Sequence, residues 1–144
     1  MICYPLNKIP KGQRIVRAEL VIPLYPDQGE QRLQVRRVVG DWGAGVCHEY
    51  RMVRPKKVAW AKPGARDPVA DARPGASVRV RAGTKEQVVN VTEDVELWYT
   101  GVAPNQGWLI LPEFDDGRIG CHSPLSDLLP GYGSWKLIIT YEPE

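Results

Sequence analysis

Short segments with alternating apolar and polar side chains recur along this chain and predict β-strands. Residues 16–24 form the clearest of them, because apolar side chains occupy every second position at Ala18, Leu20, Ile22 and Leu24. Alternate side chains of a strand point to opposite faces, so this segment would turn one apolar face to a core. A turn signal at residues 26–29 and a second alternating segment at residues 32–36 predict that the two strands form a hairpin.

Five later segments also have strand-like patterns, at residues 58–60, 78–81, 88–91, 108–111 and 135–141. The nearly continuous apolar run at 108–111 fits a strand covered on both faces. Between these segments, residues 65–75 have the composition of a surface loop. Together, these segments predict about eight strands.

One short helix is predicted over about residues 93–100. Thr92 is a residue type that caps helix N-termini, and two acidic residues follow it, which suits the positive end of the helix dipole. Gly101 stands where a helix commonly ends. Val95, Trp98 and Tyr99 share one apolar face of this helix. We therefore expect an all-β, jelly-roll-like antiparallel β-sandwich with one helix, formed as a single domain by residues 1–144.

Composition agrees with this fold and excludes several classes of protein. The 144 residues include 13 Pro and 14 Gly, spread along the chain as turn signals, and 43% of the residues are hydrophobic. No apolar run is long enough to cross a membrane, so membrane insertion is not expected. Nineteen Lys and Arg against 17 Asp and Glu leave a net charge of +2, which is too balanced to predict nucleic acid as a partner.

The N-terminus and the cysteines bear on the compartment. Residues 1–8 lack the basic start, apolar stretch and cleavage site of a signal peptide. We therefore expect either a protein that stays where it is made or a chain whose upstream part is missing. Three cysteines, Cys3, Cys47 and Cys121, allow one disulfide with one free thiol or three reduced thiols.

Several short motifs follow one another in a recognisable order. They are Ile9-Pro10-x-Gly12-x-x-Ile15, Ala18-x-Leu20, Val38-x-x-x-Trp42, Ala59-Trp60, Asn90-Val91-Thr92, Asn105-x-Gly107-Trp108-Leu109, and a final strand at 137–141. Over about residues 6–142 this order resembles the DNRLRE-type β-sandwich domain, a jelly-roll-like module of secreted and cell-surface bacterial proteins that is related to carbohydrate-binding modules. The resemblance implies a non-catalytic binding role outside the cell or on a cell surface.

Three departures from that family limit what the resemblance implies. Members usually have one or two strands ahead of the region that matches residues 4–6, so the sheet here would have an open edge. A neighbouring subunit or a missing upstream segment would then complete it. Leu125 stands where the family has an acidic residue, two positions after Ser123, and the stretch at 47–51 has no counterpart.

Metal binding is one hypothesis for the two histidines, because each follows a cysteine. Cys47, His48, Cys121 and His122 together make the ligand set of a tetrahedral zinc site. The spacing matches no zinc-finger pattern, and the alternative is buried cysteines with loop histidines.

An acidic cluster at Glu113, Asp115 and Asp116 predicts a tight turn at residues 116–117, with a weak calcium site as the alternative. We find no arrangement of residues that predicts catalysis, and the chain is not expected to be an enzyme.

Sugar binding is the other hypothesis, because sugars bind against flat aromatic faces flanked by hydrogen-bonding groups. Tyr50, Tyr132 and Trp42 are the loop aromatics that could provide such a face. The cations beside Tyr50 could bind an anionic polysaccharide such as a polyuronate, or could simply form a solvated loop; they are Arg51, Arg54, Lys56 and Lys57.

Two functions therefore remain open. The first is a non-catalytic binding or adhesion module for an anionic polysaccharide. The second is a structural assembly protein, either a virion decoration or tail-associated subunit or part of a cell-surface lattice. In that case partner subunits would complete the open edge, and a homo-oligomer would be expected. Both place the protein outside the cell, on a virion or at a cell surface.

Overall fold

The computed structural model describes residues 1–113, 118–121 and 134–144, and consists mainly of antiparallel strands. The strands are β1 (Gln13–Pro23), β2 (Gln31–Val38), β3 (Tyr50–Met52), β4 (Val58–Ala59), β5 (Ala72–Arg73), β6 (Ser77–Val80), β7 (Glu86–Asn90), β8 (Trp108–Pro112) and β9 (Lys136–Pro143), and the helix is α1 (Thr92–Tyr99). The predicted all-β, sandwich-like fold with one short helix is confirmed. The strands at β3 and β5 were not predicted, since they have only three and two residues and are too short to show an alternating pattern.

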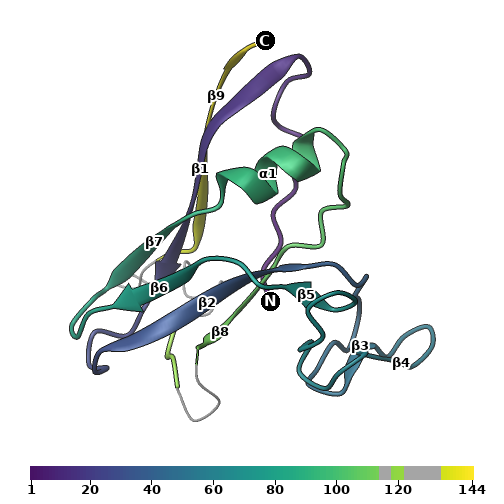
Figure 1. The fold of residues 1–144 in the computed structure, drawn as a ribbon, viewed down its shortest axis with the longest axis vertical. Helices are drawn as coiled ribbons and strands as arrows, with labels where there is room; N and C mark the ends of the chain where they lie inside the picture. The colour runs from purple at the N-terminus through teal and green to yellow at the C-terminus, as the bar shows by residue number, and fades with distance from the viewer. Residues whose placement is uncertain (114–117, 122–133) are drawn as a thin grey trace.

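Two sheets face each other across the main core (Figure 1). In the first, β1 lies between β7 and β9. In the second, β2 pairs with β8 along one edge and with β6 and then β5 along the other. A separate two-stranded hairpin, β3–β4, projects to one side of these sheets.

The predicted hairpin between the first two strands is wrong. β1 and β2 belong to different sheets, yet both turn their apolar faces into one core, where Leu20 and Leu33 are completely buried. The alternating pattern identifies which face of a strand is buried, but the same pattern results whether the next strand lies beside it or across the core. The segment between β1 and β2 therefore crosses from one sheet to the other.

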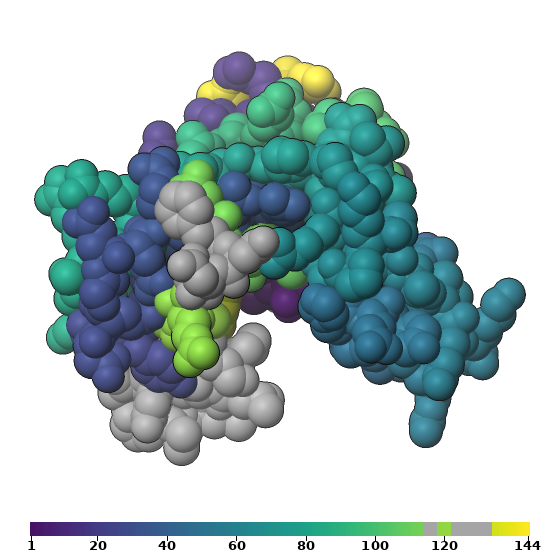
Figure 2. All heavy atoms as spheres, turned by 60° about the horizontal axis from the view of Figure 1, so that its bottom comes forward, coloured from purple at the N-terminus to yellow at the C-terminus, as the bar shows by residue number. Residues whose placement is uncertain are grey.

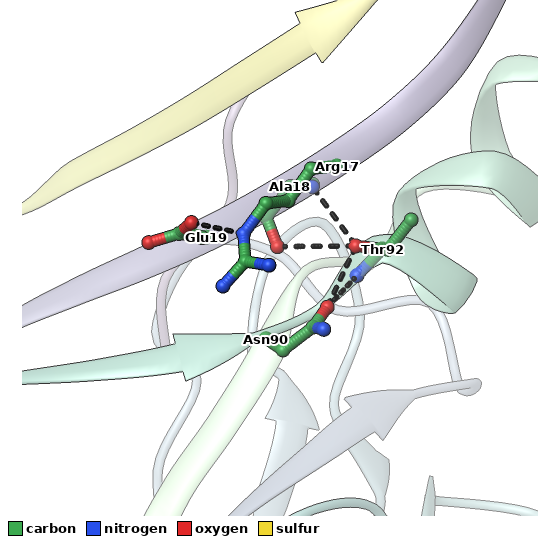
Figure 3. Close-up of polar contacts among 5 residues, drawn as sticks. All are labelled: Arg17, Ala18, Glu19, Asn90 and Thr92. Carbon is green, nitrogen blue, oxygen red and sulfur yellow. Dashed lines mark hydrogen bonds and ion pairs between the residues drawn. The ribbon is translucent and has the colours of Figure 1, made fainter.

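Helix α1 begins one residue earlier than predicted, and Thr92 is not its N-cap. Val91 occupies the cap position, and no side chain caps the helix there. Instead, the Thr92 hydroxyl accepts a hydrogen bond from the Ala18 amide at 2.9 Å and donates one to Asn90 Oδ1 at 2.6 Å (Figure 3). Thr92 thus joins the start of α1 to β1. The predicted end is confirmed, since Gly101 has a φ of 77°.

The helix is eight residues long, and within the described ranges no helix is long and apolar enough to cross a membrane.

Most of residues 65–75 are exposed, as their loop-like composition predicts, but the segment also contains buried side chains and a short strand. Ala65, Asp71 and Ala72 are buried, and β5 lies in this segment. The apolar side chains pack into a second, smaller core on the outer face of the β2 sheet, made of Val38, Trp60, Ala65 and Ala72, with Trp42, Val46 and Leu109 around them. Residues 41–71, which leave the sheet after β2 and return at β5, are called the 41–71 lobe below.

Candidate functional site

Asp71 holds the 41–71 lobe in shape. Its side chain is 2% exposed and accepts hydrogen bonds from three backbone amides, those of Ala61, Lys62 and Asp67, at 2.8, 2.9 and 3.1 Å. Its own carbonyl accepts the amide of Val39 at 2.8 Å. The buried carboxylate of Asp71 therefore fixes the loop after β4, and its backbone carbonyl fixes the point where the lobe leaves β2.

Two indole side chains fasten the lobe from within. The Trp60 Nε1–H donates to the Cys47 carbonyl at 2.9 Å, and the Trp42 Nε1–H donates to the Gln106 carbonyl just ahead of β8 at 2.7 Å. Both indole N–H groups are therefore already bonded to the backbone. Any ligand beside these rings would meet their carbon edges and faces.

A pocket of about 390 Å³ lies between the lobe and the outer face of β8. Figure 2 shows a hollow between the blue-teal lobe and the β2 side of the molecule, with N-terminal residues at its floor. The residues that line the pocket are Met1, Trp42, Val46, Cys47, His48, Trp60, Gly64, Arg66, Leu109 and Leu111. Most of this wall is apolar, and His48 and Arg66 add polar groups.

The pairing of β8 explains why leucines reach this pocket. Trp108 and Ile110 belong to the main core, so Leu109 and Leu111 point to the opposite face of the sheet. The N-terminal segment lies against the start of the same strand, where Ile2 exchanges two backbone hydrogen bonds with Trp108 at 2.8 and 2.9 Å. Gly107, with a φ of 73°, permits this approach, because a Cβ there would lie 2.2 Å from the Ile2 carbonyl oxygen.

The excess of positive charge is concentrated in the lobe. Residues 41–71 contain six Lys and Arg against four Asp and Glu, and the rest of the chain contains 13 of each. The net charge of +2 is therefore the charge of the lobe. One of its acids, Asp41, forms an ion pair with Arg51, and another, Asp71, is buried.

The predicted ligand-binding residues of this segment lie on the β3–β4 hairpin and do not line the pocket. The Lys57 ammonium lies 5.5 Å from the centroid of the Tyr50 ring, a cation–π contact. Arg54 and Lys56 are exposed, and neither forms an ion pair with any described residue. Arg51 is engaged by Asp41, and Tyr132 lies outside the described residues.

The zinc hypothesis can be followed in the structure only for Cys47, His48 and Cys121. His122 lies outside the described residues, and within those ranges no group of three His, Cys, Asp or Glu side chains could hold a metal ion. Cys3, Cys47 and Cys121 are free thiols, so residues 47 and 121 are not bridged. Burial raises the pKa of the Cys121 thiol, which disfavours the thiolate that metal binding needs.

Of the proposed calcium ligands, only Glu113 lies within the described residues. Its carboxylate pairs with the guanidinium of Arg32 at 2.7 Å, and this ion pair already supplies a counter-charge. Asp115 and Asp116, together with the turn predicted at residues 116–117, lie outside the described residues.

Most residues of the pocket wall were not predicted from the sequence to bind a ligand. Trp60 belongs to the small core and also lines the pocket, and Leu109 lies on the outer face of β8, a strand that the sequence predicts to be covered on both faces. Arg66 fell in the segment predicted to be a surface loop. Cys47 and His48 were singled out for metal binding and instead lie side by side in the pocket wall.

Comparisons of this chain with models of protein families, with curated proteins and with solved structures find no match.

Proposed function

We propose that this chain is a non-catalytic binding module that holds an anionic polysaccharide, such as a polyuronate, against the 41–71 lobe. One observation carries the proposal: an aromatic-lined pocket lies beside the part of the chain that contains the whole excess of positive charge. The motif order that resembles DNRLRE-type domains also favours a binding module that acts outside the cell or at a surface.

The chemistry of a uronate matches the two parts of this surface. A sugar ring has an apolar face of C–H groups that packs against aromatic carbon, and Trp42 offers such carbon in the pocket wall. The carboxylate of each sugar residue needs a cation, and Arg54, Lys56 and Lys57 are exposed on the same lobe that forms one side of the pocket. The volume of about 390 Å³ lies within the range of roughly 300–1,000 Å³ typical of small-ligand sites.

Affinity gel electrophoresis tests the proposal. Native protein is run through gels that contain polygalacturonate, a neutral dextran or no polymer. We expect retardation only in polygalacturonate, and we expect salt to weaken it because the contacts are ionic. Equal mobility in all three gels would contradict the proposal.

Matched variants locate the binding surface. Lys56→Ala/Lys57→Ala removes two exposed cations from the lobe, and Arg81→Ala/Lys85→Ala removes two exposed cations from the turn between β6 and β7. Both variants change the net charge by the same amount. We expect only the first to lose retardation; an equal loss in both would indicate unspecific attraction to a polyanion.

A second candidate function rests on the apolar side chains that remain exposed on and around the β7–β1–β9 sheet. Val16, Val88, Ile138 and Tyr141 are between 42% and 53% exposed. Such side chains suit a structural subunit of a virion or of a cell-surface lattice, whose neighbours would cover them. Negative-stain electron microscopy of concentrated protein separates the two candidates, since a lattice subunit would form extended lattices or rings of many subunits and a binding module would not.

A further inference from the structure

Strand β9 is an open edge whose sequence is complementary to itself. It pairs with β1 on one side, and in the described part of the chain no strand pairs with its other side. Figure 1 shows β9, in yellow, running alongside β1 toward the C-terminus. The strand has eight residues, whereas β7 at the opposite edge has five and leads directly into α1. β9 therefore offers the longer row of backbone groups for pairing.

The sequence of β9 lacks the features that usually keep edge strands from pairing. Residues 137–141 are Leu, Ile, Ile, Thr and Tyr, an uncharged run without glycine or proline in which all but Leu137 favour strands. Charge stands only at the ends of this stretch, as Lys136 before it and Glu142 after it, and Pro143 ends the strand. An edge of this composition readily accepts another strand.

We propose that β9 pairs antiparallel with β9 of a second copy of this chain, about a two-fold axis at Ile139. In this register Lys136 of each copy lies opposite Glu142 of the other, and Leu137 lies opposite Tyr141. The two β7–β1–β9 sheets then join into one continuous six-stranded sheet. The partner strand is β9 of a second copy because β9 has a positive charge near its start and a negative charge near its end, and these charges meet when two copies pair antiparallel.

The burial pattern supports this register. Leu137 and Ile139 pack against the main core, whereas Lys136, Ile138 and Thr140 are exposed on the other face. Residues directly opposite each other in an antiparallel pair point to the same face of the sheet. The core-facing residues of one copy therefore lie opposite the core-facing residues of the other only if the two-fold axis is at a residue, and not between two residues. An axis at Ile138 would set Lys136 opposite Thr140, and an axis at Thr140 would set Glu142 opposite Ile138. The axis at Ile139 places both charges opposite an opposite charge.

The proposed dimer explains why the aromatic side chain of Tyr141 is exposed in the single chain. Tyr141 pairs with Ile15, a core residue, so it lies on the core-facing side of the sheet, yet it is 42% exposed. The partner's Leu137 would cover its ring.

On the opposite face, Glu142 already forms an ion pair with Arg14, and the partner's Lys136 would extend this pair into a three-residue network.

Sedimentation equilibrium over a dilution series, with the full chain, tests the proposal. We expect a concentration-dependent dimer of the native chain. Lys136→Glu alone, or Glu142→Lys alone, places like charges opposite each other twice in the dimer and should raise the dissociation constant about ten-fold. The double variant Lys136→Glu/Glu142→Lys restores opposite charges and should restore the dimer.

Both side chains are exposed, so these variants are expected to fold, and circular dichroism checks this. A native chain that stays at 16.1 kDa at every concentration would overturn the proposal. So would a dimer that the single variants leave intact, or one that the double variant fails to rescue. None of these outcomes depends on polysaccharide binding.

Discussion

The indole N–H of Trp108 donates a hydrogen bond to the carboxylate of Asp94, with 2.8 Å between Nε1 and Oδ2. Trp108 lies in β8 and Asp94 in the first turn of α1, so this bond fastens the helix to the second sheet. The guanidinium of Arg37, on β2, lies 3.3 Å from the other carboxylate oxygen. Thr92 fastens the same end of α1 to β1 in the first sheet. The helix therefore ties the two sheets together at one end of the sandwich.

Removing the Trp108 indole N–H should destabilise the fold more than removing that of Trp98. The two rings are neighbours, with centroids 4.6 Å apart, but the Trp98 N–H has no hydrogen-bond partner among the described residues. Trp108→Phe leaves a largely buried carboxylate without its donor, which typically costs about 1–3 kcal/mol beyond the lost volume. Urea denaturation of Trp108→Phe and Trp98→Phe measures the difference, and equal losses would contradict this role of the Trp108 hydrogen bond.

The pH dependence of stability should contain a contribution from Asp94. Burial raises the pKa of this carboxyl, and the Trp108 hydrogen bond and Arg37 oppose the rise without cancelling it. The folded chain therefore binds the proton more tightly than the unfolded chain, in which the pKa is about 3.9. The stabilisation is complete below the unfolded pKa and is lost as the pH rises through the folded pKa.

Subtracting the unfolding free energy of Asp94→Asn from that of the native chain isolates this contribution. The difference should fall as the pH rises from below the unfolded pKa of about 3.9 through the raised folded pKa, and should then level off. Chemical denaturation at several pH values measures it. A difference that is constant, or that grows with pH, would disprove the assignment.

Asp71→Ala should loosen the 41–71 lobe and leave the sandwich folded. The substitution leaves the three backbone amides of Ala61, Lys62 and Asp67 without their acceptor; an unpaired donor typically costs about 1–3 kcal/mol when fully buried, and less when part-buried as these three are. Hydrogen exchange should accelerate at these amides and not at Val91, whose amide bonds to Ala18 in the main sheet.

Glu49→Gln is the control for this substitution, because Glu49 is exposed on the same lobe. It should leave every one of these exchange rates unchanged. If Asp71→Ala accelerated exchange equally throughout the chain, the lobe would not be a separately opening unit.

Thiol modification should report on the pocket. Cys47 is exposed and lines the pocket, whereas Cys121 is half-buried and burial raises the pKa of its thiol. We expect iodoacetamide, followed by mass spectrometry, to modify Cys47 before Cys121. Oligogalacturonate should slow the modification of Cys47 and leave that of Cys3, which lies outside the pocket wall, unchanged. No protection of Cys47 at saturating oligogalacturonate would argue against binding in the pocket.

The sequence was sufficient to predict the fold class and most buried faces, because both follow from local alternation. Ala18, Leu20, Ile22 and Leu24 were all predicted to face the core, and all are buried. Strand pairing was predicted less well, since the partners of β1 begin more than 60 residues further along the chain. Thr92 had the right residue type for a cap, but its hydroxyl bonds to β1, a contact that no local pattern contains.

The candidate site could be predicted only in part. The cluster of cations beside Tyr50 is visible in the sequence, and Tyr50 and Lys57 do lie in contact. The pocket is not visible, because its wall joins the lobe to Leu109 on β8 and to Met1, which are far apart in sequence. The packing of the lobe around Asp71 could not be predicted either. This residue is buried, but it lies in a segment rich in Pro, Ala and Arg, whose composition is typical of a surface loop.

The five tryptophan indole signals of a ¹⁵N-labelled chain report where the ligand contacts the protein. Tetragalacturonate is titrated into the protein, with maltotetraose as the neutral control. We predict that the indole N–H signals of Trp42 and Trp60 shift, since both rings line the pocket, while those of Trp98 and Trp108 in the main core stay in place. If tetragalacturonate leaves the Trp42 and Trp60 signals where they were, the pocket is not the binding site and the proposed function is wrong.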